Sequence, residues 1–324
     1  MRSPDPGGAS RRQGVATILG AALCALTAGC ASTIFASSPA PDEAHAAAPI
    51  DAPRFEPRPA DAARPHVALV LSGGSIRSFA HLGVLRVLER EGLRPDLVVG
   101  TSAGAIVGAL YASGRNVADI EALAARIDWP TLIDIDPVKT VFGGAHLGWA
   151  RGDRLEAFLT RAISVPLQGL PLPFAAVATD LNTGDVVVLN HGDTARALRA
   201  SSAVPGLYEP VRSGARLLGD GQVVSPLPVS VARLLGARVV VAVDVVYPPR
   251  DASLTNPVSV LFQAVTISTW RHLMTERANA DLLVRPFIPQ AVSLALSDRA
   301  WLVEAGERAA EAMLPELRSA FVRP

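Results

Sequence analysis

The feature that most constrains the fold is a regular alternation of short apolar runs and amphipathic segments that begins at Val67. The run Val67–Leu71 is apolar throughout, as in a strand buried on both faces, and Ser72-Gly73-Gly74 ends it. Residues 79–91 then place their apolar side chains mostly on one helical face. Repetition of this strand–helix unit predicts an α/β fold, with a central mixed, mostly parallel sheet and helices on both faces.

The same alternation continues to the end of the chain, and no repeat or linker divides residues 66–324. We therefore expect one domain over residues 66–324. Further strands are expected at 97–99, 174–179, 185–189, 216–218, 239–243 and 282–284. Further helices are expected at 103–113, 120–127, 153–163, 194–202, 228–235, 258–279 and 298–321.

The first 29 residues have the layout of a bacterial export signal. Arginines at positions 2, 11 and 12 precede an apolar stretch over residues 15–28, which is too short to span a bilayer as a helix. Thr27-Ala28-Gly29-Cys30 resembles a lipobox, in which the cysteine is acylated and becomes the first mature residue. The alternative is a plain secretory signal with an incidental cysteine.

Residues 30–65 are expected to form a tether between this signal and the domain. Positions 31–65 contain 11 Ala and 7 Pro without hydrophobic periodicity, which favours a semi-extended chain. With a lipid on Cys30, the protein would be an exported, membrane-anchored lipoprotein of the cell envelope, with its domain on the periplasmic or surface side. Ala31 after the cysteine is compatible with the outer membrane.

Composition excludes several classes of function. The 30 basic and 30 acidic residues give no net charge, which argues against nucleic-acid binding. Both cysteines, Cys24 and Cys30, precede the domain, so a disulfide framework, a zinc–cysteine site and a cysteine nucleophile are not expected within it. Asp134 and Asp136 have no third ligand type nearby, so we expect neither a metal nor a cofactor.

The first motif that carries chemistry is Gly100-Thr101-Ser102-Ala103-Gly104, between an expected strand and an expected helix. A tight strand-to-helix turn makes the serine oxygen project at the helix N-terminus, and flanking glycines allow neighbouring segments to approach. Partial positive charge at that end of the helix favours a developing anion. The alternative is a glycine-rich packing turn with an ordinary serine.

The second motif is the loop Ser72-Gly73-Gly74-Ser75-Ile76-Arg77, which follows the first expected strand. Consecutive glycines can turn several backbone N–H groups toward one point, as for a phosphate or for the oxyanion of acyl transfer. The loop lacks the endings of the two common nucleotide-binding motifs. Because it and Ser102 follow successive strands of one βαβ unit, an oxyanion hole beside a nucleophile is the favoured interpretation.

The third motif is Gly219-Asp220-Gly221, which taken alone is a simple turn. In the order Gly-Gly-x-x-Arg, Gly-x-Ser-x-Gly and Asp-Gly, the three motifs resemble the patatin-like phospholipase family, over about residues 67–317. The segments 99–113, 199–206 and 223–244 fit the bacterial members closely.

This resemblance implies a serine acyl hydrolase with a Ser–Asp dyad and no histidine. Ser102 matches the nucleophile and Asp220 the base, Gly73 to Arg77 match the oxyanion loop, and Gly100 and Gly104 flank the elbow. The implied substrates are phospholipids, lysophospholipids or other lipid esters, so the chain would be a lipid-degrading phospholipase A or lysophospholipase. Two departures are Ser75, in place of the third loop glycine, and Gln222, where Gly or Ala is usual.

Three alternatives stay open at this stage. Ser75 and Gln222 favour a non-catalytic lipoprotein that binds acyl chains or a partner on the same fold. An acyltransferase would pass the acyl group to an acceptor other than water. A Ser–Asp–His triad would need His272, which lies in an expected amphipathic helix. His81 is interpreted as structural, and residues 131–149 as an apolar lid or a packed connector.

Overall fold

The computed structural model describes residues 66–128, 133–134, 147–249, 254–255, 257–288 and 296–322. The expected signal, the tether with Cys30 and most of residues 131–149, the expected lid or connector, lie outside these residues. The strands are β1 (Val67–Leu71), β2 (Leu97–Thr101), β3 (Gly148–Ala150), β4 (Phe174–Asp180), β5 (Val186–Leu189), β6 (Gly206–Tyr208), β7 (Val211–Ser213), β8 (Arg216–Asp220), β9 (Val239–Val243) and β10 (Leu282–Val284).

Helices connect most of these strands. They are α2 (Phe79–Arg90), α3 (Ala103–Ala112), α4 (Val117–Ala125), α7 (Asp153–Ala162), α8 (Thr194–Ser201), α9 (Val229–Leu234), α10 (Pro257–Asn279), α11 (Arg299–Ala312) and α12 (Leu314–Phe321). Short 3₁₀ turns are η2 (Ser75–Ser78), η3 (Leu167–Gly169), η4 (Gly221–Val223) and η6 (Leu296–Asp298). Within the described ranges, no helix is both long enough and apolar enough to cross a bilayer.

The main sheet has the order β10-β9-β1-β2-β4-β8-β7, and β5 also pairs with β4. The five strands from β10 to β4 are parallel to their neighbours, whereas β5, β7 and β8 join in antiparallel pairs. A separate pair is formed by β3 and β6. The predicted α/β class with a mixed, mostly parallel sheet is therefore confirmed.

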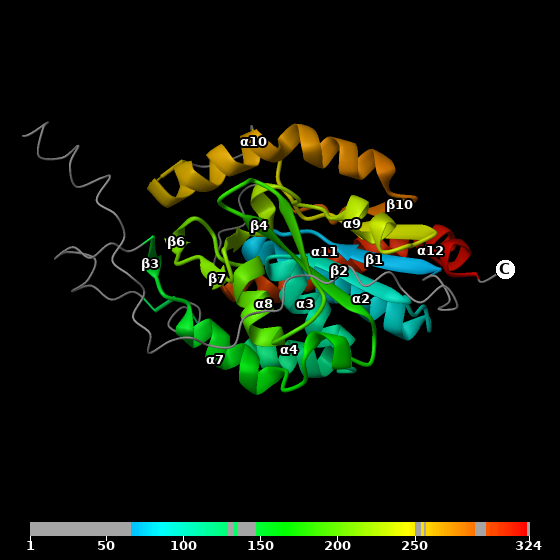
Figure 1. Ribbon diagram of the computed structural model, residues 1–324. Helices are drawn as coiled ribbons and strands as arrows, with labels where there is room; N and C mark the ends of the chain where they lie inside the picture. Colours follow the sequence, from blue (N-terminus) through cyan, green and yellow to red (C-terminus); the bar gives the residue numbers. More distant parts are fainter. Residues whose placement is uncertain are drawn as a thin grey trace, which may run out of the picture. The chain divides into compact units, whose positions relative to one another are not determined.

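Helices cover both faces of this sheet (Figure 1). Alternate residues of β1 show the two layers: Leu69 and Leu71 belong to a core cluster shared with α2, α3, α8 and α11, whereas Ala68 and Val70 belong to one shared with α9 and α10. Strands buried on both faces are expected to be apolar throughout, which explains the run over residues 67–71.

Two details of the secondary structure differ from expectation. The expected helix 298–321 is interrupted at Met313, where α11 ends and α12 begins with Pro315 in its first turn. Proline there lacks the N–H that a continuing helix would need, so the break has a local cause. The three-residue strands β3, β6 and β7 were not expected, because such short strands show no periodicity.

Candidate active site

Ser102 lies at the turn between β2 and α3 with φ 54° and ψ −128°, a backbone conformation that L-residues rarely adopt. The close packing around it explains the flanking glycines. A Cβ at position 100 would lie 2.6 Å from the Ala105 Cα, and one at position 104 would lie 2.3 Å from the Ser72 carbonyl oxygen. Gly100 therefore allows the tight turn itself, and Gly104 brings that turn against the segment that ends β1.

The turn is held by further hydrogen bonds. The Ser102 N–H donates to the Ser201 hydroxyl of α8 at 3.0 Å, and that hydroxyl donates to the Val177 carbonyl of β4. The Ser102 carbonyl accepts from the N–H of Ala105 at 2.9 Å. A strained backbone conformation persists only where the surrounding structure holds it in place. Here these hydrogen bonds hold it, and the conformation directs the serine side chain toward Asp220.

Asp220 reaches Ser102 across 118 positions of the chain. In the register of the sheet, Thr101 pairs with Val177 and Asp220 pairs with Ala178, so the residues at the ends of β2 and β8 meet beside β4. The Ser102 hydroxyl donates to the Asp220 Oδ2 at 2.8 Å. The pairing of the strands therefore brings the two side chains into direct contact.

The Asp220 carboxyl group is almost completely buried, with 2% of the residue exposed. Burial raises its pKa from 3.8 to about 7, while hydrogen bonds from the Gln222 N–H to Oδ1 and from the Ser102 hydroxyl oppose this rise. A carboxylate with this pKa is a far better proton acceptor near neutral pH than an aspartate in water.

The loop after β1 lies beside this pair, and its N–H groups divide into two sets. The Gly73 N–H donates to the Pro226 carbonyl at 3.0 Å, and the Arg77 N–H donates to the Gly74 carbonyl at 3.1 Å. Within the described part of the chain, the N–H groups of Gly74, Ser75 and Ile76 have no acceptor. The candidate oxyanion donors are therefore narrowed to these three, and the N–H groups of Gly73 and Arg77 are occupied.

Ser75 has φ 52°, so the departure from glycine falls at a position where the chain does adopt the left-handed region. Its backbone conformation costs a serine on the order of 1 kcal/mol relative to a relaxed one. The loop nevertheless takes this shape, because Gly74 and Arg77 close the turn that begins η2.

The side chains of His81 and Arg77 make two further contacts at this loop. The buried imidazole of His81 contacts the Ser72 carbonyl through Nε2 at 2.9 Å, and burial lowers the pKa of His81 to about 4. The ring is therefore neutral and donates through Nε2. The Arg77 guanidinium lies 4.3 Å from the centre of the Tyr247 ring and so faces an aromatic side chain.

The remaining titratable candidates lie in other contacts. His272 on α10 pairs with Glu276 at 3.2 Å, and the Ser102 hydroxyl has Asp220 as its acceptor. Asp134 accepts from the N–H groups of Gly152 and Asp153 and so caps α7. Over the described ranges, no group of three or more His, Cys, Asp or Glu side chains could hold a metal ion.

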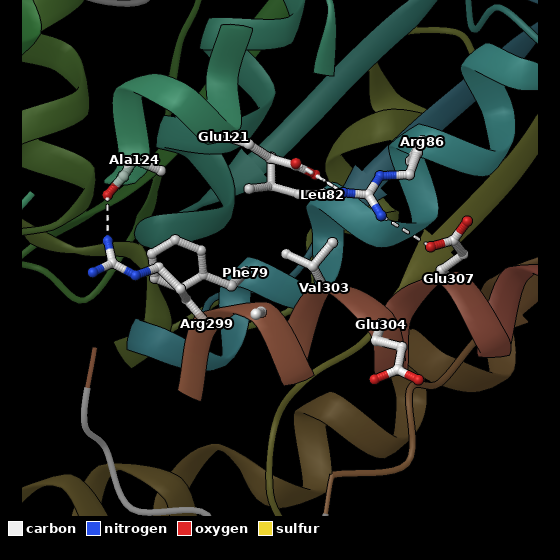
Figure 2. Close-up of a pocket in the computed structure, with 10 residues that line it drawn as sticks. Phe79, Leu82, Arg86, Glu121, Ala124, Arg299, Val303, Glu304 and Glu307 are labelled. Carbon is white, nitrogen blue, oxygen red and sulfur yellow. Dashed lines mark hydrogen bonds and ion pairs between the residues drawn. The ribbon is translucent and has the colours of Figure 1, made fainter. Parts of the chain in front are cut away.

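A cavity of about 320 Å³ lies among α2, α4 and α11 (Figure 2), and neither Ser102 nor Asp220 lines it. Arg86 lies between Glu121 and Glu307 there, and Arg299 donates to the Ala124 carbonyl at 3.1 Å. Both arginines already have partners within the protein, so the cavity adds no evident binding group to the candidate active site.

Two residues of the site were missed by sequence reasoning. Ser201 lies in a segment that already fitted the bacterial relatives, but nothing in its neighbourhood indicates the contact with the Ser102 N–H. Gln222 was noted only as a departure, although its N–H donates to Asp220 at 2.8 Å. Such contacts depend on tertiary structure that local patterns do not contain.

Comparison with known proteins places this site in context. A family model described as patatin-like phospholipase matches residues 69–233, a stretch that includes the loop after β1, Ser102 and Asp220. An uncharacterized NTE family protein of Mycobacterium bovis is 34% identical over 194 residues, which are 58% of this chain and 52% of that protein. Patatin-like phospholipase domain-containing protein 7 of Rattus norvegicus is 34% identical over 190 residues, 55% of this chain and 13% of that protein.

The fold is also similar to a solved structure. VipD from Legionella pneumophila matches with a TM-score of 0.52 at 15% sequence identity, over 79% of this chain and 67% of that one. This likeness concerns the fold. The chain spans about half the length of the mycobacterial relative and a small part of the rat protein.

Proposed function

Because the chain belongs to the patatin-like phospholipase family, we propose that it is a serine hydrolase that cleaves carboxylic esters of phospholipids or lysophospholipids. The observation that carries this proposal is the 2.8 Å hydrogen bond from the Ser102 hydroxyl to a buried aspartate. A nucleophile and a base within hydrogen-bond reach are what covalent acyl transfer needs.

In the proposed first step, the Ser102 Oγ attacks the ester carbonyl carbon as its proton passes to Asp220. The carbonyl π electrons move to the oxygen, and the free N–H groups of Gly74, Ser75 and Ile76 are the candidates that stabilise the resulting oxyanion. Collapse of this intermediate breaks the bond to the alcohol, which leaves with the proton from Asp220. In the second step, water attacks the acyl carbon and gives a proton to Asp220. The bond to the Ser102 Oγ then breaks, the fatty acid leaves, and Asp220 returns the proton to the serine oxygen.

The pKa of Asp220, raised by burial to about 7, supports its role as this base. Near pH 7 a large fraction of the carboxyl group is ionised, yet it is basic enough to accept the serine proton. No imidazole is required, in keeping with the contacts of His81 and His272, each of which is engaged elsewhere.

Hydrolysis of a lysophospholipid above its critical micelle concentration tests the proposal. We expect fatty acid release by the full chain to exceed its turnover of a soluble acetyl ester, because a lipid hydrolase binds the acyl chain. Ser102→Ala should abolish this activity, whereas the control Ser113→Ala should retain it. Equal turnover of acetyl and long-chain esters, or full activity of Ser102→Ala, would contradict the proposal.

We also propose that the mature protein is a lipoprotein of the bacterial cell envelope, anchored by lipid on Cys30. The support is the arginine-flanked apolar segment and the lipobox-like Thr27-Ala28-Gly29-Cys30. Cys30→Ser should release the protein into the soluble fraction or leave an unprocessed precursor. Unchanged mature mass and membrane fractionation of that variant would refute the anchor.

A further inference from the structure

The side chain of Gln222 lies in the proposed active site, between the loop after β1 and the nucleophile. A Cβ built at Gly73 would lie 2.0 Å from the Gln222 Oε1, 3.1 Å from its Cδ and 3.4 Å from the Ser102 Cβ. The carboxamide therefore packs directly on Gly73 and beside Ser102. Its own backbone is fixed there, because the Gln222 N–H donates to the Asp220 Oδ1 at 2.8 Å.

Among the described residues, this carboxamide has no hydrogen-bond partner. Its Oε1 is buried and unpaired, and no bond from its Nε2 is found within the described ranges. The Nε2 is not buried, so it is the end of the carboxamide that a ligand can reach. An amide nitrogen is a donor, and this one already offers N–H groups without any rearrangement of the side chain.

The loop itself leaves a place for such a donor. The N–H of Gly73, the loop residue on which the carboxamide packs, is occupied by the Pro226 carbonyl. The free backbone donors begin only at Gly74. At the end of the loop next to Gln222, a side-chain N–H would therefore replace a missing backbone one.

We propose that Gln222 is a catalytic residue, whose Nε2–H donates a hydrogen bond to the oxyanion formed when Ser102 attacks the ester. This role rests on the proposed function. The Oγ–carbon bond forms, the carbonyl π pair moves to oxygen and the serine proton passes to Asp220. Gln222 keeps its protons throughout and contributes only the hydrogen bond, which is stronger to the oxyanion than to the neutral carbonyl.

The first test is the steady-state kinetics of Gln222→Met in the full chain, because methionine has a similar length and no donor. We expect its kcat on the micellar lysophospholipid to fall about 10²–10³-fold, as for the loss of one oxyanion donor, with KM changed only a few-fold. Gln168→Met, at an exposed glutamine of η3, is the matched control and should keep the wild-type kcat.

A second measurement separates this role from a structural one. A long-chain trifluoromethyl ketone adds to an active serine and gives a tetrahedral adduct with an oxyanion. Its inhibition constant for Gln222→Met should rise by about the factor by which kcat/KM falls. A merely structural role would change thermal unfolding without this correspondence.

Two results would overturn the proposed role of Gln222 and leave the proposed function standing. One is a wild-type kcat for Gln222→Met, and the other is a Gln222→Gly variant that is more active than the wild type. The second would mean that the side chain obstructs the site. If the wild-type chain hydrolyses no lipid ester and forms no ketone adduct, the proposed function fails, and this role fails with it.

Discussion

Replacing Asp220 by asparagine should make the protein more stable near pH 8 while it removes the proposed base. The carboxylate is buried, so its ionisation opposes folding. An asparagine has nearly the same shape. Its oxygen can accept from the Gln222 N–H, and its amide can donate to the Ser102 hydroxyl oxygen, which occupies the two contacts that the structure shows.

The magnitude follows from the pKa of Asp220, which burial raises from 3.8 to about 7. Three units correspond to about 4 kcal/mol of free energy of unfolding, an upper figure for this change. Because the folded pKa lies above the unfolded one, the folded state binds more protons between pH 4 and 7. The contribution of Asp220 to stability therefore falls as pH rises through this window and is constant above it.

His81 produces the opposite slope and partly conceals this effect in the wild type. Burial lowers its pKa from 6.5 to about 4, so its contribution to stability is lost as pH falls from 6.5 to 4. Across this pH range, the contribution of His81 to the free energy of unfolding changes by about 3 kcal/mol, by the same conversion. We therefore expect a shallow pH dependence in the wild type, and a free energy of unfolding that rises with pH in Asp220→Asn.

Urea unfolding followed by tryptophan fluorescence at pH 4.5 and pH 8 measures both variants. The stability of Asp220→Asn relative to the wild type should increase by about 3 kcal/mol between these two pH values. Asp119→Asn, at an exposed aspartate, is the control and should show no such change. Parallel pH profiles of the wild type and Asp220→Asn would refute the reasoning that burial of this carboxylate raises its pKa.

Three other outcomes are expected. The kcat/KM for lipid esters should fall about tenfold per unit below pH 7, as Asp220 takes up a proton; a rate profile flat from pH 5 to 8 would exclude it as the base. Ser75→Val should lower the urea midpoint and Ser75→Gly should not, because φ 52° strains a β-branched residue; equal midpoints would argue against the left-handed loop. Gly104→Ala should cost at least about 2 kcal/mol of stability, since its Cβ would lie 2.3 Å from the Ser72 carbonyl oxygen. The control is Gly169→Ala, whose Cβ would make only ordinary contacts. Similar urea midpoints for the two variants would contradict this packing.

Much of the fold follows from local patterns. The strands 67–71, 239–243 and 282–284 have their expected bounds, because short apolar runs flanked by polar or glycine residues leave little freedom in placing a buried strand. Strands β3, β6 and β7 could not be found in this way. Each has three residues and forms only against a partner that is distant or across a turn, so its own composition contains no signal.

For the candidate site too, local patterns predict some features and leave others out. Motif spacing singles out Ser102 and Asp220, but the distance between their side chains depends on the pairing of β4 with β2 and with β8. The left-handed backbone of Ser75 depends on the turn that Gly74 and Arg77 close, which a serine at this position does not indicate. The unpaired carboxamide of Gln222 depends on packing against Gly73, which no local pattern reveals.

The most direct test of the central claim is the rate at which a fluorophosphonate modifies the full chain, followed by intact mass and peptide mapping. We predict a single adduct on Ser102, no adduct in Ser102→Ala, and a rate lower by about 10³-fold or more in Asp220→Asn, since the two side chains act as one unit. His272→Ala should react at the wild-type rate, because that ring pairs with Glu276. Modification of Asp220→Asn at the wild-type rate, or loss of reaction in His272→Ala, would contradict the account.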